Sequence, residues 1–474
     1  MLLISLFLII NATRAFPNEN QEVKIFYRCY RDLTQNQPKF DHPSLEKIRS
    51  GKNSAIDECA AMLDRAVIED NQLFQSDQEV LNVISNFHDL HTSWLDKKKW
   101  ILINGYVYGM AQADIADVTD PALYYTYAMF SNQRRFSLAV TLNRVPRPIR
   151  EKMNPEVSPY RKYAKTKYTI KEDFSFSPTG RLIGIELKLP QEINYITQTP
   201  SNSSGVSTSV FRYRNYGGGI IGDSSYILSH LKLDMMLKKE DQFYYRPPFD
   251  GAINVHRDWA KGIFQDILCR ELPVVGLKDA VDFVDQNASG SFRHTASCAR
   301  CHASMDRLSY LIRNVRVKDS LAPSGVAMGM FPEFMNPILP SENLIWPGDS
   351  IENFHLRPAY GRLYFRTFDN KIIDKKIKSL DHLGYTISQL EDYYMCGVKR
   401  YYRYLIGIDI PIVNPDQIPE GEPGLMESDE AVKHLRNIRK LTKSFMKDDD
   451  PVGLIKKIIA LDVYRERAIG SGGF

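Results

Sequence analysis

The chain has few features that would place it in a membrane or on nucleic acid. The apolar run at residues 2–10 is too short to span a bilayer, and no later run in the 474 residues approaches membrane length. Charge of neither sign is in large excess, because 61 Lys and Arg face 57 Asp and Glu, a formal net charge of +4. This balance gives no argument for nucleic acid or an anionic membrane as a partner, although peripheral membrane contact stays open.

The sequence also lacks the common hydrolase and nucleotide-binding signatures. It contains no nucleophile elbow, no H-E-x-x-H zinc motif and no phosphate loop. Residues 217–222, GGGIIG, formally satisfy G-x-G-x-x-G, but the dinucleotide motif requires a preceding buried strand within a β–α–β unit. The residues before it, 211–216, are mostly polar, and no alternation of strands and helices surrounds them. We therefore predict a flexible turn that leads into a helix near residues 224–236.

Cysteine is scarce, with six residues in the chain. Two lie together in one short motif, and the other four are dispersed: Cys29, Cys59, Cys269 and Cys396. In an oxidising compartment four thiols usually pair, and three connectivities are available. We favour Cys29–Cys59, which would link one local helical segment, and Cys269–Cys396 by elimination. Four buried free thiols are the alternative.

The other two cysteines form the pentapeptide Cys298-Ala-Arg-Cys301-His302, which has the C-x-x-C-H pattern of c-type haem attachment. With six Cys and ten His in the chain, chance placement gives this pattern in roughly one chain in six hundred. The spacing places both thiols on one helical turn, where they could form thioethers with the two porphyrin vinyl groups. His302 would then be the proximal iron ligand. The motif predicts one covalent haem c.

Zinc and a disulfide are the two other interpretations of this motif. Zinc requires four converging ligands, and no second C-x-x-C or H-x-x-x-H completes a tetrahedral site. A Cys298–Cys301 disulfide, or a pair of reduced thiols, is the other alternative. If haem is bound, the nearest cations, Arg293 and Arg300, could pair with its propionates, although exposed charges are the default interpretation of both. His294 is better placed to form a hydrogen bond with a propionate than to cross the ring.

The amino terminus predicts export. The apolar run from Leu2 to Ile10 is followed by Thr13-Arg14-Ala15, whose small residues suit signal-peptidase cleavage. No Lys or Arg precedes the run, so a retained anchor is the alternative to a signal peptide at residues 1–15. Covalent haem attachment takes place outside the cytoplasm, so the two motifs agree. We expect a periplasmic or secreted protein of the bacterial envelope.

The sequence does not settle the second axial ligand of the predicted haem. A Met or His in the sixth position would favour electron transfer, whereas an open position would permit small-molecule chemistry. Met305 would share the side of the ring with His302 and is disfavoured. His88 and His91 lie three residues apart on a predicted helix, a pair that more often belongs to the core or surface. The favoured candidates are methionines on a downstream loop: Met328, Met330 and Met335.

The apolar periodicity predicts a mainly α, multi-domain helical protein with minor β hairpins. Helical spacing recurs in four long segments: residues 44–66, 78–95, 256–270 and 383–405. Two terminal helices are expected after residue 423, the second starting at Pro451 behind an Asp450 cap. Hairpins are expected within residues 167–189 and 362–377. Residues 320–361, rich in Pro, Gly and Met, are expected to form an extended loop.

Several pieces of the second half follow the order of motifs in one protein family. Residues 294–306, HTASCARCHASMD, are similar to its centre H…C-x-x-C-H-x-x-M-D-P, and residues 263–273 to the helix before it. Residues 394–407 are similar to its C-x-x-x-R-x-x-x-Y-x-x-G helix, and residues 454–465 to its closing L-x-x-x-I-x-x-S-x-x-Y-R. On these motifs the chain resembles, over residues 255–468, the planctomycete-type cytochrome-c-like exported bacterial proteins. It departs from their pattern where Arg307 replaces Pro and Leu461 replaces Ser.

The resemblance implies an exported protein with a cytochrome-c-like haem segment, and little about its substrate. We expect an exported c-type cytochrome-like protein that exchanges electrons with a redox partner protein or a small donor or acceptor. Enzymatic activity, if present, would be that of a haem-dependent oxidoreductase. The alternative is an exported, envelope-associated binding or structural protein with structural cysteines and no haem. We divide the chain into a signal peptide, an N-terminal mainly helical domain, a haem domain, and a linker with C-terminal helices that pack on it: residues 1–15, 16–250, 251–410 and 411–474.

Overall fold

A computed structural model gives the fold. It describes residues 19–69, 77–95, 120–150, 182–189, 215–230, 236–239, 242–245, 251–287, 291–321, 327–334, 336–338, 354–411, 416 and 429–470. The predicted signal peptide lies outside these residues. Within them, no helix combines the length and the apolar character that a membrane span requires.

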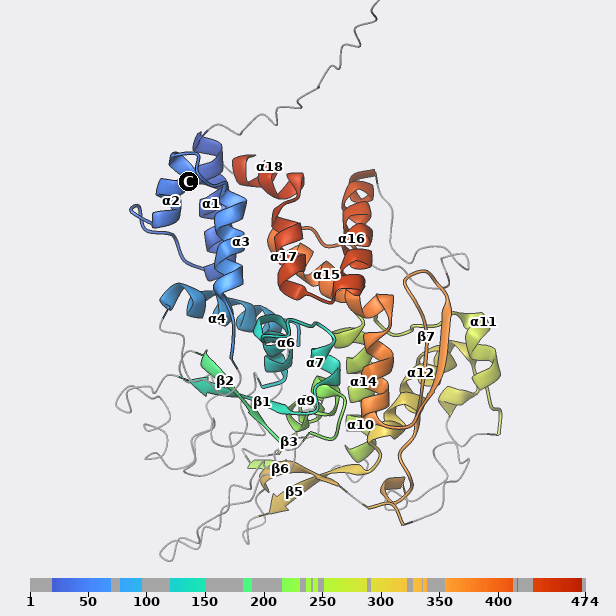
Figure 1. Ribbon diagram of the computed structural model, residues 1–474. Coiled ribbons are helices and arrows are strands. Elements are labelled where there is room, and N and C mark those ends of the chain that lie inside the picture. Colours follow the sequence, from blue (N-terminus) through green and yellow to red (C-terminus); the bar gives the residue numbers. More distant parts are fainter. Residues whose placement is uncertain are drawn as a thin grey trace, which may run out of the picture.

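The described residues form a mainly helical fold, as the sequence predicts (Figure 1). The helices of the first part are α1 (Glu19–Thr34), α2 (Pro43–Arg49), α3 (Ala55–Arg65), α4 (Gln78–Ser93), α6 (Asp120–Phe130), α7 (Leu138–Thr141) and α9 (Ser224–Leu228). Residues 44–66, which carry apolar residues at helical spacing, form the two helices α2 and α3. Gly51 adopts a φ of 67°, which ends the first helix, and Ser54 starts α3 with a capping box that includes Asp57.

The second part is also built from helices, with one π-helical turn, η5 (Ile263–Ile267), at the end of α10. Its helices are α10 (Gly251–Gly262), α11 (Leu277–Ala280), α12 (Ala296–Ser309), α14 (Leu380–Ser388), α15 (Glu391–Ile406), α16 (Asp429–Asp448), α17 (Pro451–Ile459) and α18 (Asp462–Gly470). The helix predicted over residues 383–405 is broken between α14 and α15. Within residues 429–470, the described part of this end, there are three helices where two were expected. Pro451 starts α17 as predicted, but the Asp450 side chain makes no capping hydrogen bond.

Four two-stranded antiparallel sheets are present among the described residues. They pair β1 (Val145–Arg150) with β2 (Leu182–Lys188), β3 (Met236–Lys239) with β4 (Gln242–Tyr245), β5 (Val315–Leu321) with β6 (Ala327–Phe334), and β7 (Gly361–Arg366) with β8 (Ile372–Ile377). The last pair is the predicted hairpin, which turns through Asn370 at a φ of 55°. Strand β2 pairs with β1. One expectation is corrected: β6 and the end of β5 form a paired strand ladder within residues 320–361, where an extended loop was expected. Residues 167–176 lie outside the described part.

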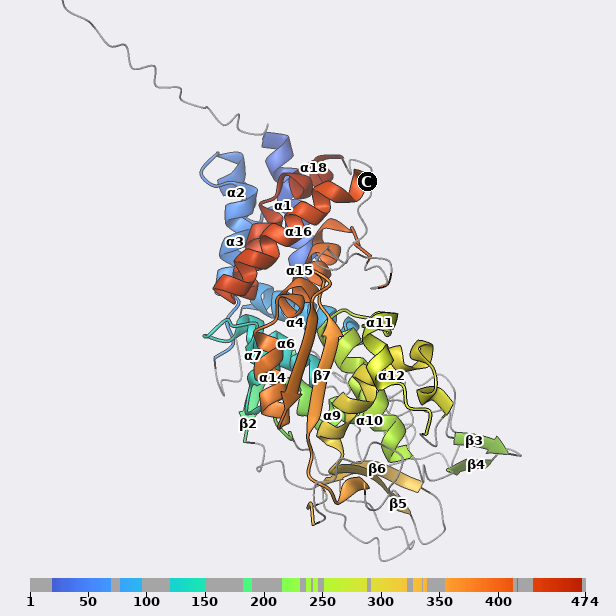
Figure 2. The same ribbon diagram turned by 90° about the vertical axis from the view of Figure 1, so that its right-hand side faces the viewer.

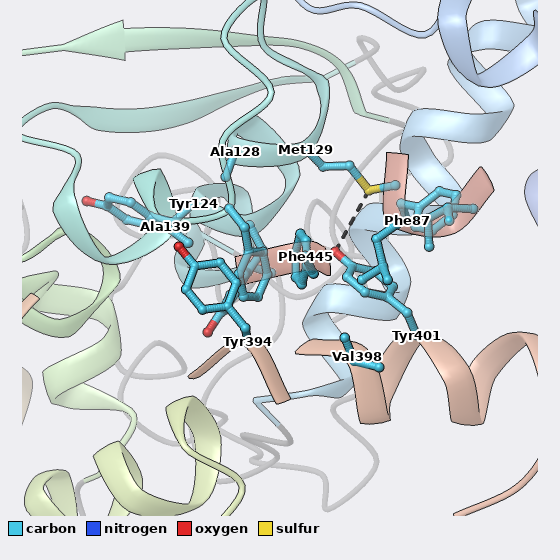
Figure 3. Close-up of a cluster of buried hydrophobic side chains, with 14 of the residues drawn as sticks. Phe87, Tyr124, Ala128, Met129, Ala139, Tyr394, Val398, Tyr401 and Phe445 are labelled. Atoms are coloured by element: carbon cyan, nitrogen blue, oxygen red, sulfur yellow. Dashed lines mark hydrogen bonds between the residues drawn. The ribbon is translucent and has the colours of Figure 1, made fainter. Parts of the chain in front are cut away.

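One cluster of buried apolar side chains runs through the molecule, from Ile25 in α1 to Ala468 in α18. Figure 3 shows its centre, where Phe87 of α4, Met129 of α6 and Tyr401 of α15 converge. The Tyr401 hydroxyl lies 3.9 Å from the Met129 sulfur. Helices from both halves of the chain thus share one core, and the domain boundaries at residues 250 and 410 stay predictions.

The two ends of the described chain meet. Helices α1 and α18 lie side by side in both views of the fold (Figures 1 and 2). Tyr464 donates a hydrogen bond of 2.9 Å to Asp32, and Arg465 forms an ion pair of 2.7 Å with Glu22. Arg28 lies over the Tyr464 ring at 4.5 Å. These polar contacts fix α1 against α18.

The four dispersed cysteines form the two pairs that the sequence analysis favoured. Cys29 of α1 is bonded to Cys59 of α3, with 6.4 Å between their Cα atoms. Cys269, just after η5, is bonded to Cys396 of α15, with 5.2 Å between Cα atoms. The second bond joins segments 127 residues apart, at the junction between α10 and the long helix of the core.

Candidate functional site

The C-x-x-C-H motif lies in the first two turns of α12, which packs against α10, α11 and β7 (Figure 2). Cys298 is exposed and Cys301 partly exposed, and both carry free thiols. The side chain of His302 is 23% exposed. The buried positions of the same turns are alanines, Ala299 and Ala303, which face the protein. A spacing of three and four residues therefore presents both thiols and the imidazole on one open face of a single helix.

Asp306, one turn after His302, holds the imidazole from the buried side. The carboxylate is 4% exposed, and the His302 Nδ1 lies 3.2 and 3.1 Å from its two oxygens. A carboxylate only accepts hydrogen bonds, so the imidazole donates to Asp306 through Nδ1. Arg257 of α10 donates to the same carboxylate at 2.8 and 3.2 Å, and Arg293 lies 3.9 Å away. Two guanidinium groups thus hold Asp306 in place.

An aromatic ring supports one face of this imidazole. Phe292, in the short helical turn η7 (Ser291–Arg293), stacks on His302 with 4.1 Å between ring centroids and 28° between planes. Arg257 and Arg293 lie over the Phe292 ring at 5.3 and 5.8 Å. The stack covers one face of the imidazole and not its Nε2 edge. Nε2 has no hydrogen-bond partner among the described residues.

The two thiols differ in their surroundings. Burial raises the pKa of the Cys301 thiol, and nearby Cys298 adds to this, while the positive charges of Arg300 and Lys261 oppose it. Arg300 itself forms an ion pair of 2.6 Å with Asp416, which also accepts a hydrogen bond of 2.7 Å from the Leu277 amide at the start of α11. This pair anchors the first turn of α12 to α11.

The expected propionate partners are engaged within the protein. Arg293 is 8% exposed and faces Asp306, and Arg300 pairs with Asp416. His294 follows η7 and is partly buried, and its carbonyl oxygen accepts a hydrogen bond from Gln286. The default interpretation of Arg293 as an exposed charge is therefore wrong, because it is buried beside Asp306, and a propionate role for either arginine stays a prediction.

His88 and His91 belong to the core. They are 1% and 0% exposed, and the Nδ1 of each lies within 3.2 Å of the Thr126 hydroxyl. The Nε2 of His91 is 2.8 Å from the Tyr401 hydroxyl. Burial, together with His88 and Arg400, holds the pKa of His91 well below its usual value. Both imidazoles make internal hydrogen bonds, which confirms the expectation that such a pair more often belongs to the core or surface than to a ligand site.

The candidate distal ligands are only partly placed. Met328 and Met330 lie in β6, where Met330 pairs with Asp319 of β5, and Met335 lies outside the described residues. All three stay predictions. Met305, on the same face of α12 as the thiols, is partly buried against the core.

The glycine-rich segment is a packing element. Residues 219–222 form a buried 3-10 turn, η3, where the sequence suggested a flexible turn, and α9 after it spans only five residues. A Cβ on Gly219 would collide with the Ala139 carbonyl in α7, and one on Gly218 with the Leu380 carbonyl in α14. Gly218 and Gly219 also have positive φ values of 71° and 58°. Glycine is required here because two helix backbones approach the turn closely.

The residues that sequence reasoning missed are Asp306, Arg257 and Phe292. Asp306 could have been found, because its spacing of four residues from His302 predicts contact on a helix. Arg257 and Phe292 come from separate elements, and no local pattern links them to the motif. The donor set fits a covalent haem: two free thiols on one turn and an imidazole with an open Nε2. Among the described residues, no group of three or more His, Cys, Asp or Glu side chains is arranged to hold a metal ion.

Comparison of the chain with models of protein families, with curated proteins and with solved structures gives no match. The resemblance described above therefore depends on the sequence motifs alone.

Proposed function

We propose that this chain is an exported c-type cytochrome-like protein that carries one covalent haem on α12. One observation carries the proposal: four of the six cysteines are bonded in pairs, while Cys298 and Cys301 keep free thiols on the same open face as His302. Structural thiols are commonly buried or bonded. A pair that is neither fully buried nor bonded, beside an imidazole whose Nε2 has no partner among the described residues, has the chemistry that haem attachment requires.

Attachment would proceed by addition, so no group leaves. Each thiol would add across one vinyl double bond of the porphyrin, with its sulfur bonding to one vinyl carbon and a hydrogen to the other. Cys298 and Cys301 would then fix the ring edge to α12, and His302 would supply the axial nitrogen. The haem would supply a one-electron redox centre, and the protein would supply its orientation and surroundings.

The setting of this activity is also a proposal. Two disulfides favour an oxidising compartment, which agrees with the predicted export to the periplasm or beyond the cell. The electron would be exchanged with a redox partner protein or a small donor or acceptor. An active enzyme would be a haem-dependent oxidoreductase.

The test is expression of the full chain, with its own amino terminus, in cells competent for c-type haem maturation. We expect a pyridine haemochrome spectrum that survives acid–acetone extraction, because thioether bonds resist it. The double variant Cys298→Ala/Cys301→Ala should lose this signal. The matched double variant Cys29→Ala/Cys59→Ala removes as many cysteines but should retain it.

A wild-type chain without covalent haem in such cells would overturn the proposal. The two thiols would then be structural, and the weight would move to an exported, envelope-associated binding or structural protein. If haem is present, changing Met328, Met330 and Met335 to Ala in turn identifies a methionine ligand. Loss of that ligand should alter the visible spectrum and lower the midpoint potential, because axial Met raises it.

A further inference from the structure

We infer that Asp306 is a positioning residue, which fixes His302 in the Nδ1–H tautomer and directs its Nε2 lone pair toward the open face of α12. The role of His302 as an iron ligand belongs to the proposed function, on which this inference rests in part. The tautomer itself is a property of the chain and can be measured without haem.

The geometry favours a strong hydrogen bond from the imidazole to the carboxylate. The His302 Nδ1 is within 3.2 Å of both Asp306 oxygens, and the carboxylate is almost fully buried. Water therefore competes little for the acceptor, and the bond is stronger than it would be at the surface. Metal-binding histidines commonly donate a hydrogen bond from their second ring nitrogen to such a partner, which fixes both the tautomer and the ring orientation.

The position of Asp306 does not depend on His302. Arg257 makes a bidentate contact with the carboxylate from α10, and Arg293 approaches from η7. A bidentate guanidinium–carboxylate pair has a defined geometry as well as a favourable energy. Phe292 limits rotation of the imidazole by stacking on its face. The ring is thus held by a carboxylate that is itself held, so its orientation is set before any ligand is bound.

This arrangement has an electronic consequence for a bound iron. A carboxylate that accepts the Nδ1 proton makes the imidazole more basic and a better electron donor. A better donor stabilises the oxidised metal, so Asp306 should lower the midpoint potential. Arg257 neutralises part of the carboxylate charge and should act in the opposite direction. The two residues therefore predict shifts of opposite sign.

The first experiment needs no haem. The full chain is produced in cells without c-type maturation, labelled with ¹⁵N-histidine, and studied by NMR at alkaline pH, where the imidazoles are neutral. A His302→Gln variant assigns the His302 signals among the ten histidines. We expect the Nδ1–H tautomer in the wild type and loss of this preference in Asp306→Ala. An Nε2–H tautomer in the wild type overturns the inference, and this result does not depend on how well the variant folds.

The second experiment measures the midpoint potential of the haem-loaded protein. We expect Asp306→Asn to raise it, because the side chain keeps its shape but loses its charge, and Arg257→Gln to lower it. Asp282, exposed in the turn η6 (Val281–Phe283) that also packs on α12, provides the control Asp282→Asn. A shift in Asp306→Asn no larger than in this control would contradict the electronic role.

The two experiments separate this inference from the proposed function. If no covalent haem forms, the proposed function fails while the tautomer still reports on Asp306. If haem forms and the tautomer is Nε2–H, the inference fails and the proposed function stands.

Discussion

At the scale of single residues, the carboxyl of Asp392 is buried near a second charged group, the guanidinium of Arg270. It is 2% exposed and accepts a hydrogen bond of 3.0 Å from the Phe368 amide. Burial raises its pKa to about 7, against the opposing effect of Arg270. His256 shows the reverse case: burial, with His355 adding to it, lowers its pKa to about 3.

These two shifts predict opposing pH dependences of stability. The pKa of Asp392 is higher in the folded than in the unfolded chain, so the folded state binds more protons between pH 3.8 and about 7. The contribution of Asp392 to the protein's free energy of unfolding therefore falls as pH rises through this range, by up to about 4 kcal/mol. The pKa of His256 is lower when folded, so its contribution is complete above pH 6.5 and is lost as pH falls toward about 3.

We predict that Asp392→Asn removes the decrease in stability with rising pH that Asp392 causes. The increase in stability with rising pH that His256 causes should remain. The free energy of unfolding of the variant should rise more steeply between pH 4 and 7 than that of the wild type. Urea titrations at a series of pH values measure this directly. Glu391→Gln, at the neighbouring and more exposed position, is the matched control. A slope in Asp392→Asn that parallels the wild type would show that the buried carboxyl is not the source.

At this scale the sequence identified the motif but not its support. The spacing within residues 298–302 was sufficient to place two thiols and an imidazole on one helix face, because helical periodicity is local. The arginine partners of Asp306 are residues 257 and 293, Phe292 stacks on His302, and tertiary packing alone brings all three to α12. The spacing of His88 and His91 predicted a shared face as well, but only the fold shows that this face is internal.

Individual elements were predicted where periodicity was strong and the ends were marked. Helix α4 and the β7–β8 hairpin occur where the pattern placed them. The segment at residues 44–66 is divided into two helices by Gly51 and the Ser54 capping box. The long helix expected at residues 383–405 is divided into α14 and α15, and Leu390 at the start of α15 makes no side-chain cap. The pairing of β1 with β2 joins residues 145 and 188. A contact of that range carries no local signal.

The junction of α7, η3 and α14 gives a prediction at the scale of elements. Glycine normally weakens a helix, so Gly384→Ala in α14 would be expected to stabilise it by about 1 kcal/mol. Here a Cβ would overlap the Val140 carbonyl and lie 3.0 Å from the Cα of Gly218. We predict instead a destabilisation of about 1–3 kcal/mol, because the helices must separate.

Thermal or urea unfolding of Gly384→Ala measures this change. Gly470→Ala, at the end of α18, is the matched control, since a Cβ there would meet no atom within 4 Å. It should be neutral or slightly stabilising. Equal effects of the two substitutions would mean that the glycine contact between α7, η3 and α14 does not limit stability.

The whole molecule is tied together by two disulfides that close loops of different length. Cys29 and Cys59 are 30 residues apart, whereas Cys269 and Cys396 are 127 apart. In the chain-entropy account, a bond that closes a longer loop restricts the unfolded chain more. Removal of Cys269–Cys396 by double Ala substitution should therefore cost about 1 kcal/mol more than removal of Cys29–Cys59.

Chemical unfolding of the two double variants under non-reducing conditions checks this order. Both should be less stable than the wild type, each by roughly 3–5 kcal/mol. A larger loss for the short loop would show that native packing around Cys29, and not loop entropy, sets the contribution.

The mainly helical class was predictable from composition and periodicity. The shared core was not, because it depends on contacts between segments hundreds of residues apart.

The contact between α1 and α18 sets an order of events during biogenesis. A ribosome releases α1 long before α18, since Asp32 and its partner Tyr464 are separated by 432 residues. Part of the surface of α1 therefore stays uncovered until α18 has been synthesised. Pairings of such range slow folding. A nascent chain that stops before α18 would lack the partners of α1, so the contact surface of α1 would stay exposed.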